Sequence, residues 1–401
     1  MGRCLGRRRR HGGCMKPASR LVHPPKPGAQ PTATVNPLIQ KGSTVLLPDA
    51  RALYDDDAFV TYGRSGLASH EALKSALCDL ERAEAVELYP SGVAAVAGAL
   101  LAVLKAGDEL LMTDTAYKPT RRFCDRTLAR FGVTTRYYDP TLSPPEVEAL
   151  MGPRTRLIFL ESPGSLSFEM QDVPTLAAIA RRRGILSLID NTWGAGHVLK
   201  PLDLGVDISI QALTKYVGGH SDSFMGSAAA RDPDIAARLK AGVTDLGWSV
   251  AAEDAYAMLR GLRTLDVRLR RHEATGLALA SWLEARPEVL QVLHPALPGA
   301  PGHDLWKRDY SGACGLFALV LKPAQAGATA AFLDALQVFG LGFSWGGFES
   351  LAIDCDPQLE VRQFRRDYGG ALVRLHAGLE DVEDLIADLE SGLEAWRRLA
   401  A

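Results

Sequence analysis

The sequence predicts an α/β protein with a large, mostly parallel sheet covered by helices, a smaller C-terminal α/β domain and an extended N-terminal arm. Short apolar segments alternate with helical segments from residue 68 to residue 212, and longer helical patterns begin after residue 247. Such alternation is typical of parallel sheets covered on both faces. The 401 residues are 47% hydrophobic and 23% charged, which fits a globular protein of more than one domain.

The alternation begins with a helix at 68–80, where leucines recur every three or four residues. Apolar runs predict strands, at 110–112, 133–138, 157–160, 185–189 and 208–212. Helical periodicity predicts helices between or beside these strands, at 93–105, 119–130, 144–151 and 173–183. Together these elements form the predicted large domain, residues 67–262.

The C-terminal part begins with one long helical pattern that runs from residue 247 to residue 283. A segment rich in proline and glycine follows, then a strand at 316–321 and an amphipathic helix at 382–399. We place the start of the small domain, residues 263–401, within the long helical pattern.

The N-terminal arm, residues 1–66, contains many prolines, and its first 48 residues have no Asp or Glu. We expect an extended chain between residues 15 and 48. The arginines at 7–10 are followed neither by a Ser-rich amphipathic helix nor by an apolar stretch, which transit and signal peptides respectively require. We therefore expect translation to start at Met15, with residues 1–14 an over-extension.

The composition excludes several classes of function. A net charge of -2 gives no basic field for nucleic acid, and no apolar run reaches the roughly 20 residues of a membrane helix. The six cysteines form no CxxC pair and no His/Cys cluster with metal-ligand spacing. We therefore expect reduced thiols, a cytoplasmic protein and no metal site.

Lys215 and Asp190 are the residues most informative about chemistry. Asp190 ends a hydrophobic strand, and a lysine with a buried carboxylate is what a pyridoxal phosphate (PLP) site requires. The lysine forms a Schiff base with the cofactor aldehyde, and the carboxylate keeps the pyridine nitrogen protonated. Each also has an ordinary interpretation, a solvated lysine and a helix cap. The neighbouring Thr214, Gly218 and Gly219 favour a ligand site.

A possible phosphate site precedes them, at 89–95, where a strand is joined to a helix of small residues. Free backbone N–H groups and the positive end of the helix dipole favour an anion there. The dinucleotide motif GxGxxG and the P-loop motif are absent from this segment. The alternative is an Ala-rich core helix.

Several segments resemble the Cys/Met metabolism family of fold-type I PLP enzymes. They are 190–193 (DNTW), 213–222 (LTKYVGGHSD), 260–265 (RGLRTL) and 343–347 (FSWGG). Two more, 294–299 (HPALPG) and 302–309 (GHDLWKRD), are similar to the bacterial cystathionine β-lyases of this family. The similarity extends from about Asn36 to the C-terminus, and so many motifs in order make coincidence improbable.

The resemblance implies the cofactor site. Lys215 is the expected Schiff-base lysine and the base that moves the Cα proton, and Asp190 the expected partner of the pyridinium nitrogen. Tyr117 is expected to stack on the cofactor ring. The remaining expected contacts are those to the phosphate, from the backbone of Gly92 and Val93 and the hydroxyl of Thr214.

The resemblance also implies a shared active site. Tyr62 and Arg64 are expected to reach the phosphate and the substrate entrance of a neighbouring subunit, which implies a dimer and usually a tetramer. Arg374 is expected to bind the substrate α-carboxylate, beside Ser344 and Trp345. The expected catalytic residues are Lys215, Tyr117 and Tyr62.

Four departures from the family pattern bear on specificity. Ala212 replaces a serine common in relatives, and Ser165 replaces a common asparagine. Phe343 stands where many γ-acting relatives have glutamate, and Pro119 where methionine γ-lyases have a reactive cysteine. The last two favour β-chemistry.

The expected reaction is therefore β-cleavage of L-cystathionine to homocysteine, pyruvate and ammonia in methionine biosynthesis. A broader cysteine-conjugate or cystine β-lyase, a γ-lyase and a sulfhydrylase remain alternatives, because they share every cofactor residue. A PLP-loaded regulatory protein is a further alternative, although no DNA-binding appendage is visible in the sequence.

Overall fold

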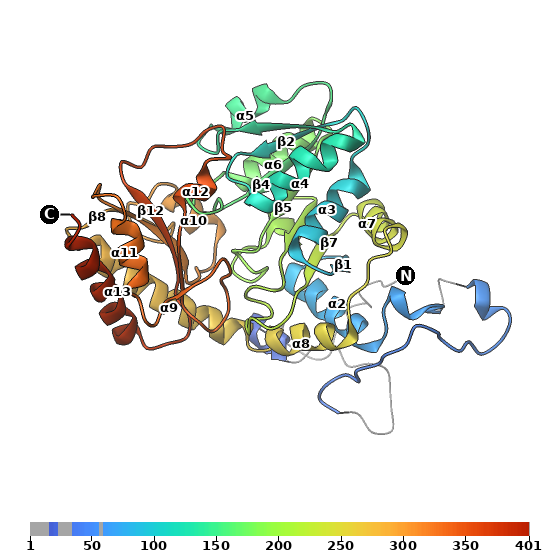
Figure 1. Ribbon diagram of the computed structural model, residues 1–401. Helices are drawn as coiled ribbons and strands as arrows, with labels where there is room; N and C mark the ends of the chain where they lie inside the picture. Colours follow the sequence, from blue (N-terminus) through green and yellow to red (C-terminus); the bar gives the residue numbers. More distant parts are fainter. Residues whose placement is uncertain (1–15, 23–33, 56–58, 401) are drawn as a thin grey trace.

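The computed structural model describes residues 16–22, 34–55 and 59–400, in which the chain forms two β-sheets flanked by helices (Figure 1). The larger sheet has seven strands in the order β1-β7-β6-β5-β4-β2-β3. Their bounds are Ala85–Tyr89 (β1), Glu109–Thr113 (β2), Thr134–Tyr138 (β3), Thr155–Glu161 (β4), Leu186–Asp190 (β5), Ile208–Gln211 (β6) and Gly226–Ala230 (β7).

The larger sheet is mostly parallel, as predicted, from β3 through β6. Strand β7 is the exception, because it runs antiparallel to both of its neighbours, β1 and β6. The sequence did not reveal β7, since its residues are Gly, Ser and Ala, which have low strand propensity. Small residues are needed there: a Cβ on Gly226 would lie 2.4 Å from the carbonyl oxygen of Ser91.

Both faces of the larger sheet are buried, with strand residues pointing alternately to each side. On β4, Leu157 and Phe159 join one hydrophobic cluster, while Ile158 and Leu160 join another. The first face is covered by α3 (Gly92–Val103), α4 (Lys118–Arg126) and α7 (Pro233–Asp245). The second is covered by α2 (Ala68–Glu81), α5 (Pro144–Leu150), α6 (Val173–Arg182) and α8 (Ala252–Leu262).

Two predicted helices are divided in the structure. The segment expected as one helix at 119–130 is α4 followed by a 3₁₀ turn, Leu128–Phe131. The long helical pattern is two helices, α8 and α9 (Leu265–Glu284). The break follows from tertiary contacts: the buried guanidinium of Arg268 donates to the carbonyl of Gly261 at 2.8 Å and to that of Tyr216 at 2.7 Å. A domain boundary near residue 262 stays a prediction.

The smaller sheet has the order β10-β11-β12-β9-β8. Its β10 and β11 are parallel, and its other pairs are antiparallel. The bounds of its strands are Val289–Leu293 (β8), Leu316–Leu321 (β9), Gly340–Leu341 (β10), Leu351–Asp354 (β11) and Ala371–His376 (β12). Helices α9, α11 (Ala328–Asp334) and α13 (Val382–Arg397) cover one face. Two short helices, α10 (His303–Asp309) and α12 (Asp356–Leu359), complete this part.

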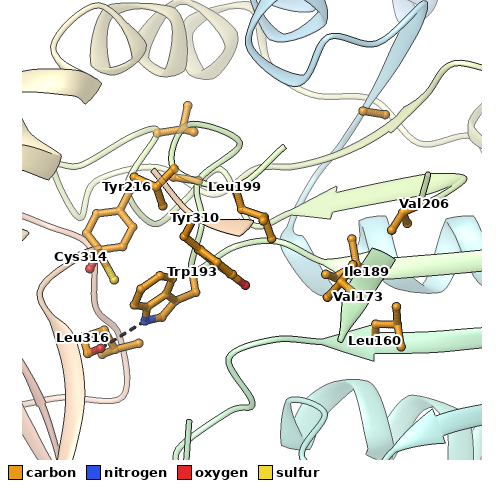
Figure 2. Packing of buried hydrophobic residues seen from close by; sticks show 14 of the residues in the cluster. Leu160, Val173, Ile189, Trp193, Leu199, Val206, Tyr216, Tyr310, Cys314 and Leu316 are labelled. Atoms are coloured by element: carbon orange, nitrogen blue, oxygen red, sulfur yellow. Dashed lines mark hydrogen bonds between the residues drawn. The ribbon is translucent and has the colours of Figure 1, made fainter. Parts of the chain in front are cut away.

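The face of the smaller sheet opposite these helices joins the hydrophobic core of the larger sheet. Leu316, Ala318 and Val320 of β9 belong to the same hydrophobic cluster as Ile158 and Leu160. Figure 2 shows Trp193, just beyond β5, donating through Nε1 to the carbonyl of Leu316 at 3.2 Å. Its ring lies edge-on to Tyr310, with ring centres 5.7 Å apart. One continuous core therefore joins the two sheets.

The N-terminal arm differs in part from expectation. Pro17–Val22 form a short helix, α1, where an extended chain was expected. The helix forms because Leu21 is buried in the core beside Ala76 and Leu80 of α2. The arginines at 7–10 and the expected start at Met15 lie outside the described residues.

Cys124, Cys314 and Cys355 are free and buried, in agreement with the expected reduced thiols. Cys78 is disulfide-bonded, which corrects that expectation at this position, because cysteines far apart in sequence can pair without a CxxC motif. Among the described helices, none combines the length and the apolar character needed to cross a membrane.

Candidate active site

A pocket of about 480 Å³ lies beside the carboxyl ends of β4 and β5, where open α/β sheets bind ligands. The small sheet contributes to its wall. The pocket brings together five residues proposed from the sequence, Tyr117, Asp190, Lys215, Trp345 and Arg374. Asp190 and Arg374 lie on strands of the two sheets, while Tyr117, Lys215 and Trp345 lie in connecting segments, so the site exists only in the folded chain.

Asp190 ends β5 and faces the pocket. Its Oδ1 accepts hydrogen bonds from the backbone N–H of Thr192 at 3.0 Å and from the Thr192 hydroxyl at 2.5 Å. The same hydroxyl accepts from the N–H of Ala212 at 2.9 Å, which fixes the turn after β5. Burial raises the pKa of Asp190, while the Thr192 hydrogen bonds and the charge of Lys215 act against that rise. A cationic partner in the pocket would stabilise its charge.

Lys215 follows β6 and extends into the pocket. Its Nζ donates to the hydroxyl of Ser344 at 3.0 Å and lies 5.2 Å from the centre of the Trp345 ring. Burial, and next the charge of Arg374, lower the pKa of Lys215 to about 8, while Asp190 opposes this shift. Part of the amine is thus neutral near neutral pH, as a nucleophile or base requires.

The N-terminus of α3 forms the candidate phosphate cradle. Ser91 caps this helix, because its Oγ accepts from the N–H of Ala94 at 3.1 Å. The N–H groups of Gly92 and Val93 come earlier in the first turn, where they have no intrahelical acceptor. They lie at the positive end of the helix dipole. A Cβ on Gly92 would lie 2.5 Å from the Cβ of Ala212, so this close approach requires glycine.

Thr214 lies near this cradle, but its hydroxyl is engaged by the protein. The Thr214 Oγ1 accepts from the N–H of Met225 at 3.0 Å and lies 3.2 Å from the Met225 carbonyl. Gly92, Val93 and Thr214 are not among the residues that line the pocket, although their neighbour Ala212 is. Their contact with phosphate stays a prediction.

Arg374 projects from β12 into the pocket with only 5% of its surface exposed. Its Nη2 donates to the carbonyls of Ser344 at 2.9 Å and Gly342 at 3.3 Å. Within the described residues its buried Nε has no hydrogen-bond partner. Burial lowers the pKa of Arg374. A buried guanidinium with an unused donor suits a carboxylate ligand.

Tyr117, Tyr62 and Arg64 lie in different places. Tyr117 precedes α4 and lines the pocket, and its N–H donates to Oε2 of Glu161 at 2.8 Å. Burial, and next Asp190, raise the pKa of Tyr117. Tyr62 is 49% exposed and lies outside the pocket of its own chain. Arg64 also lies outside it, with Nη1 donating to the carbonyl of Thr244 at 3.1 Å.

The arrangement fits PLP. The pocket offers a lysine whose amine has a lowered pKa, a carboxyl group that needs a cationic partner and a buried arginine with an unused donor. The glycine at the α3 N-terminus leaves room for a close anion. Within the described residues, no group of three or more His, Cys, Asp or Glu side chains could hold a metal ion.

The sequence model of the Cys/Met metabolism PLP-dependent enzymes matches residues 18–394. The chain belongs to this family. It is 47% identical over 366 residues to the putative cystathionine beta-lyase of Rhizobium johnstonii, covering 90% of this chain and 91% of that protein. It is 43% identical over 369 residues to the cystathionine beta-lyase MetC of Escherichia coli, and the match covers 89% of this chain and 93% of that protein.

Solved structures of this family share the fold. The crystal structure of metB from Corynebacterium glutamicum matches with a TM-score of 0.88 and 28% identity, over 94% of this chain and 97% of that one. The family match and these similarities confirm the predicted family, the α/β fold and PLP as the cofactor.

The four departures from the family pattern lie in or beside the pocket. Pro119, Ser165, Ala212 and Phe343 all line it. Phe343 is 76% exposed, so it presents an apolar ring at the pocket opening. The backbone of Ser165 is held in place, because its N–H donates a hydrogen bond to the carbonyl of Thr115 at 2.9 Å.

The sequence reading missed three residues that shape the pocket. Glu161 ends β4, and its position after an apolar strand was a usable signal, the same one that identified Asp190. Arg121 pairs with Asp114 at 2.6 Å and donates to the carbonyl of Val361 at 2.8 Å. Its role depends on tertiary contacts. His376 lies two residues after Arg374 on β12, behind the residues that line the pocket.

Proposed function

We propose that this protein is a PLP-dependent carbon–sulfur lyase that cleaves L-cystathionine by β-elimination to homocysteine, pyruvate and ammonia, for methionine biosynthesis. The observation that carries the proposal is the Lys215 amine, with a pKa of about 8, between Asp190 and Arg374 in one pocket. The high identity to two cystathionine β-lyases over most of each chain supports this substrate.

The cofactor, when bound, supplies an electron sink for the negative charge that develops on the substrate Cα. Lys215 would hold it through Nζ, and Asp190 would stabilise the protonated ring nitrogen with its charge. The N–H groups of Gly92 and Val93 would bind the phosphate. Tyr117 would pack its ring over the cofactor at the N-terminus of α4.

Two basic side chains, Arg374 and Lys215, would act on the substrate. Arg374 would bind the α-carboxylate and fix how the amino acid lies in the pocket. Once the substrate amine has taken the place of Nζ on the cofactor, the released, neutral Nζ of Lys215 would take the Cα proton, and the sulfur of the distal half would leave. Orientation matters because the breaking C–H bond must stand perpendicular to the electron sink. A positioned general base contributes roughly 10²- to 10⁴-fold to the rate.

The products of cystathionine cleavage test the proposal. Purified holoenzyme is incubated with L-cystathionine, and the keto acid and thiol are identified. Pyruvate with homocysteine is the expected result. 2-Oxobutyrate with cysteine would assign γ-cleavage, and absence of both keto acids would overturn the lyase assignment. Lys215→Ala is the matched control, in which product formation should nearly disappear.

We also infer that two copies of the chain share their active sites, in a dimer or a tetramer. The exposure of Tyr62 and Arg64 outside their own pocket supports this. So do the apolar side chains of the arm, since Val35 is 89% and Leu46 94% exposed. We further propose a cytoplasmic location, which the free thiols of Cys124, Cys314 and Cys355 support and the disulfide at Cys78 does not.

A further inference from the structure

We propose that His376 is a positioning residue for the reaction. Its imidazole holds the turn 342–347 in place, and this turn brings Ser344 and Trp345 to Lys215. His376 does not line the pocket, so its effect on Lys215 must pass through the turn.

His376 and Arg374 hold the same turn from one strand. They are two residues apart on β12 and therefore point to the same face of the sheet. His376 Nε2 lies 3.0 Å from the nitrogen of Gly346 and 3.2 Å from the carbonyl oxygen of Gly347, so it accepts from the first in one tautomer and donates to the second in the other. Arg374 donates to the carbonyls of Gly342 and Ser344. The turn is thus fixed on both sides of Trp345.

The turn also lies directly against the backbone of Lys215. Gly346 has a φ of +82°, which favours glycine, and a Cβ there would lie 2.9 Å from the Tyr216 nitrogen and 3.1 Å from the Lys215 Cα. A displacement of Gly346 therefore moves Ser344, whose hydroxyl accepts from Lys215 Nζ at 3.0 Å. His376 is thus connected to the Lys215 amine through Gly346 and Ser344 of the turn.

Acceptance from Gly346 requires the neutral tautomer with its proton on Nδ1, because only an unprotonated Nε2 can accept; with the proton on Nε2, the ring would donate to the Gly347 carbonyl and still contact the turn. His376 is fully buried, and burial together with the neighbouring His272 lowers its pKa well below the ordinary value. The hydrogen bond to the Gly347 carbonyl opposes this shift, while the charges of Arg374 and Lys215 act in the same direction as burial. The buried Nδ1 of His376 has no partner among the described residues. Burying a polar atom without a hydrogen-bond partner costs free energy. An apolar side chain at this position would avoid that cost but could not accept a hydrogen bond from Gly346.

His272 provides a natural comparison. It is also fully buried, and its ring centre lies 5.2 Å from that of His376. Its Nδ1 contacts the carbonyl of Ala377 at 2.8 Å, away from the turn. Both rings contact Tyr216. Packing alone would make the two histidines equivalent, whereas the proposal assigns an effect on Lys215 to His376 alone.

The experiment compares His376→Leu, His376→Gln and His272→Leu in the holoenzyme. We expect His376→Leu to lower kcat/KM for L-cystathionine by about 10- to 100-fold, as displacements of about 1 Å do. His376→Gln, which keeps an acceptor near Nε2, should recover most of the loss. The pH titration of the cofactor's visible absorbance should shift in His376→Leu and stay as in the wild type in His272→Leu.

A double-mutant cycle with Ser344→Ala tests the path. If His376 acts through Ser344, adding His376→Leu to Ser344→Ala should cause little further loss. Additive losses in the double variant would overturn the proposal. So would equal losses of kcat/KM in His376→Leu and His272→Leu together with an unchanged absorbance titration in both. Should His376→Leu not fold, His376→Asn, whose side chain is too short to reach Gly346, takes its place.

The inference uses the proposed function only for its kinetic part. A wild-type holoenzyme that releases no pyruvate from cystathionine would overturn the function, while the absorbance titrations would still decide the role of His376.

Discussion

Glu161 and Asp190 are register partners at the carboxyl ends of the adjacent parallel strands β4 and β5. Burial, and next the charge of Asp190, raise the pKa of Glu161 well above its ordinary value. Two neighbouring carboxyl groups cannot both ionise at low cost. Asp190 keeps the charge because Thr192 donates two hydrogen bonds to it and Lys215 lies near. We therefore expect Glu161 to be the protonated member of the pair, although the charge of Arg362 opposes the rise of its pKa.

A neutral Glu161 predicts that Glu161→Gln is tolerated. The amide oxygen can still accept from the N–H of Tyr117, and no charge is lost. Glu161→Ala should leave that N–H without its partner and reduce stability by about 1–3 kcal/mol. Denaturant unfolding and kcat/KM measure the two effects. An equal loss of activity in both variants would instead show that the ionised carboxylate is required.

The lowered pKa of Lys215 predicts how cofactor capture depends on pH. A lysine reacts with an aldehyde as the neutral amine, and the neutral fraction rises as pH approaches about 8 from below. In apoprotein, the initial rate of PLP capture, trapped by borohydride and measured by mass, should rise about tenfold per pH unit below that value and then level. Lys215→Arg should show no trapping at this position. A rate still rising steeply above pH 9 would contradict the lowered pKa.

The buried guanidinium of Arg374 predicts a binding defect. Arg374→Lys keeps the charge but loses the planar fork, so KM should rise by about 10- to 100-fold, the equivalent of one charged hydrogen bond. The absorbance of the bound cofactor should change little, because Arg374 is proposed to contact the substrate. A normal KM would remove Arg374 from the substrate site.

A shared active site predicts that two inactive variants complement each other. Lys215→Ala and Arg64→Ala are each expected to have low activity. After denaturation and refolding together, mixed dimers would hold one pocket with both native residues. About a quarter of the wild-type activity should return, because half of the dimers are mixed and one of their two pockets is intact. If no activity returned, Arg64 would not act in the active site of the neighbouring subunit.

The buried ion pair between Asp114 and Arg121 predicts a stability effect. The two side chains are 1% and 3% exposed and lie 2.6 Å apart. Asp114→Ala should destabilise the chain by about 3–5 kcal/mol, because it leaves a buried charge without its partner. The control is Glu253→Ala, which breaks the exposed pair with Lys41 and should leave the unfolding midpoint unchanged.

The sequence predicted most of the large sheet and the residues at its strand ends, because those signals are local. Asp190 and Lys215 each follow an apolar strand, and the family motifs supply their roles. Strand β7 was missed because its small residues resemble no strand, although contact with Ser91 demands them. The break after α8 was missed because it depends on Arg268, whose partners are distant in the chain.

The residues missed in or beside the pocket also depend on contacts between segments that are distant in the chain. Glu161 acquires its neutral state only beside Asp190, and the sequence does not state which strands are neighbours. His376 contacts a turn some thirty residues away, where the partner is a backbone N–H. Backbone partners have no sequence signature.

The hydrogen bond from Trp193 to Leu316, within the core shared by the two sheets, limits how the molecule can admit a substrate. A hinge between the sheets would expose Trp193 and Tyr310 to water and break that bond. Entry by wide opening is therefore costly in free energy. We therefore expect substrate to enter through the existing pocket opening beside the exposed Phe343, so that selection between amino acids begins there, before any of them reaches Lys215.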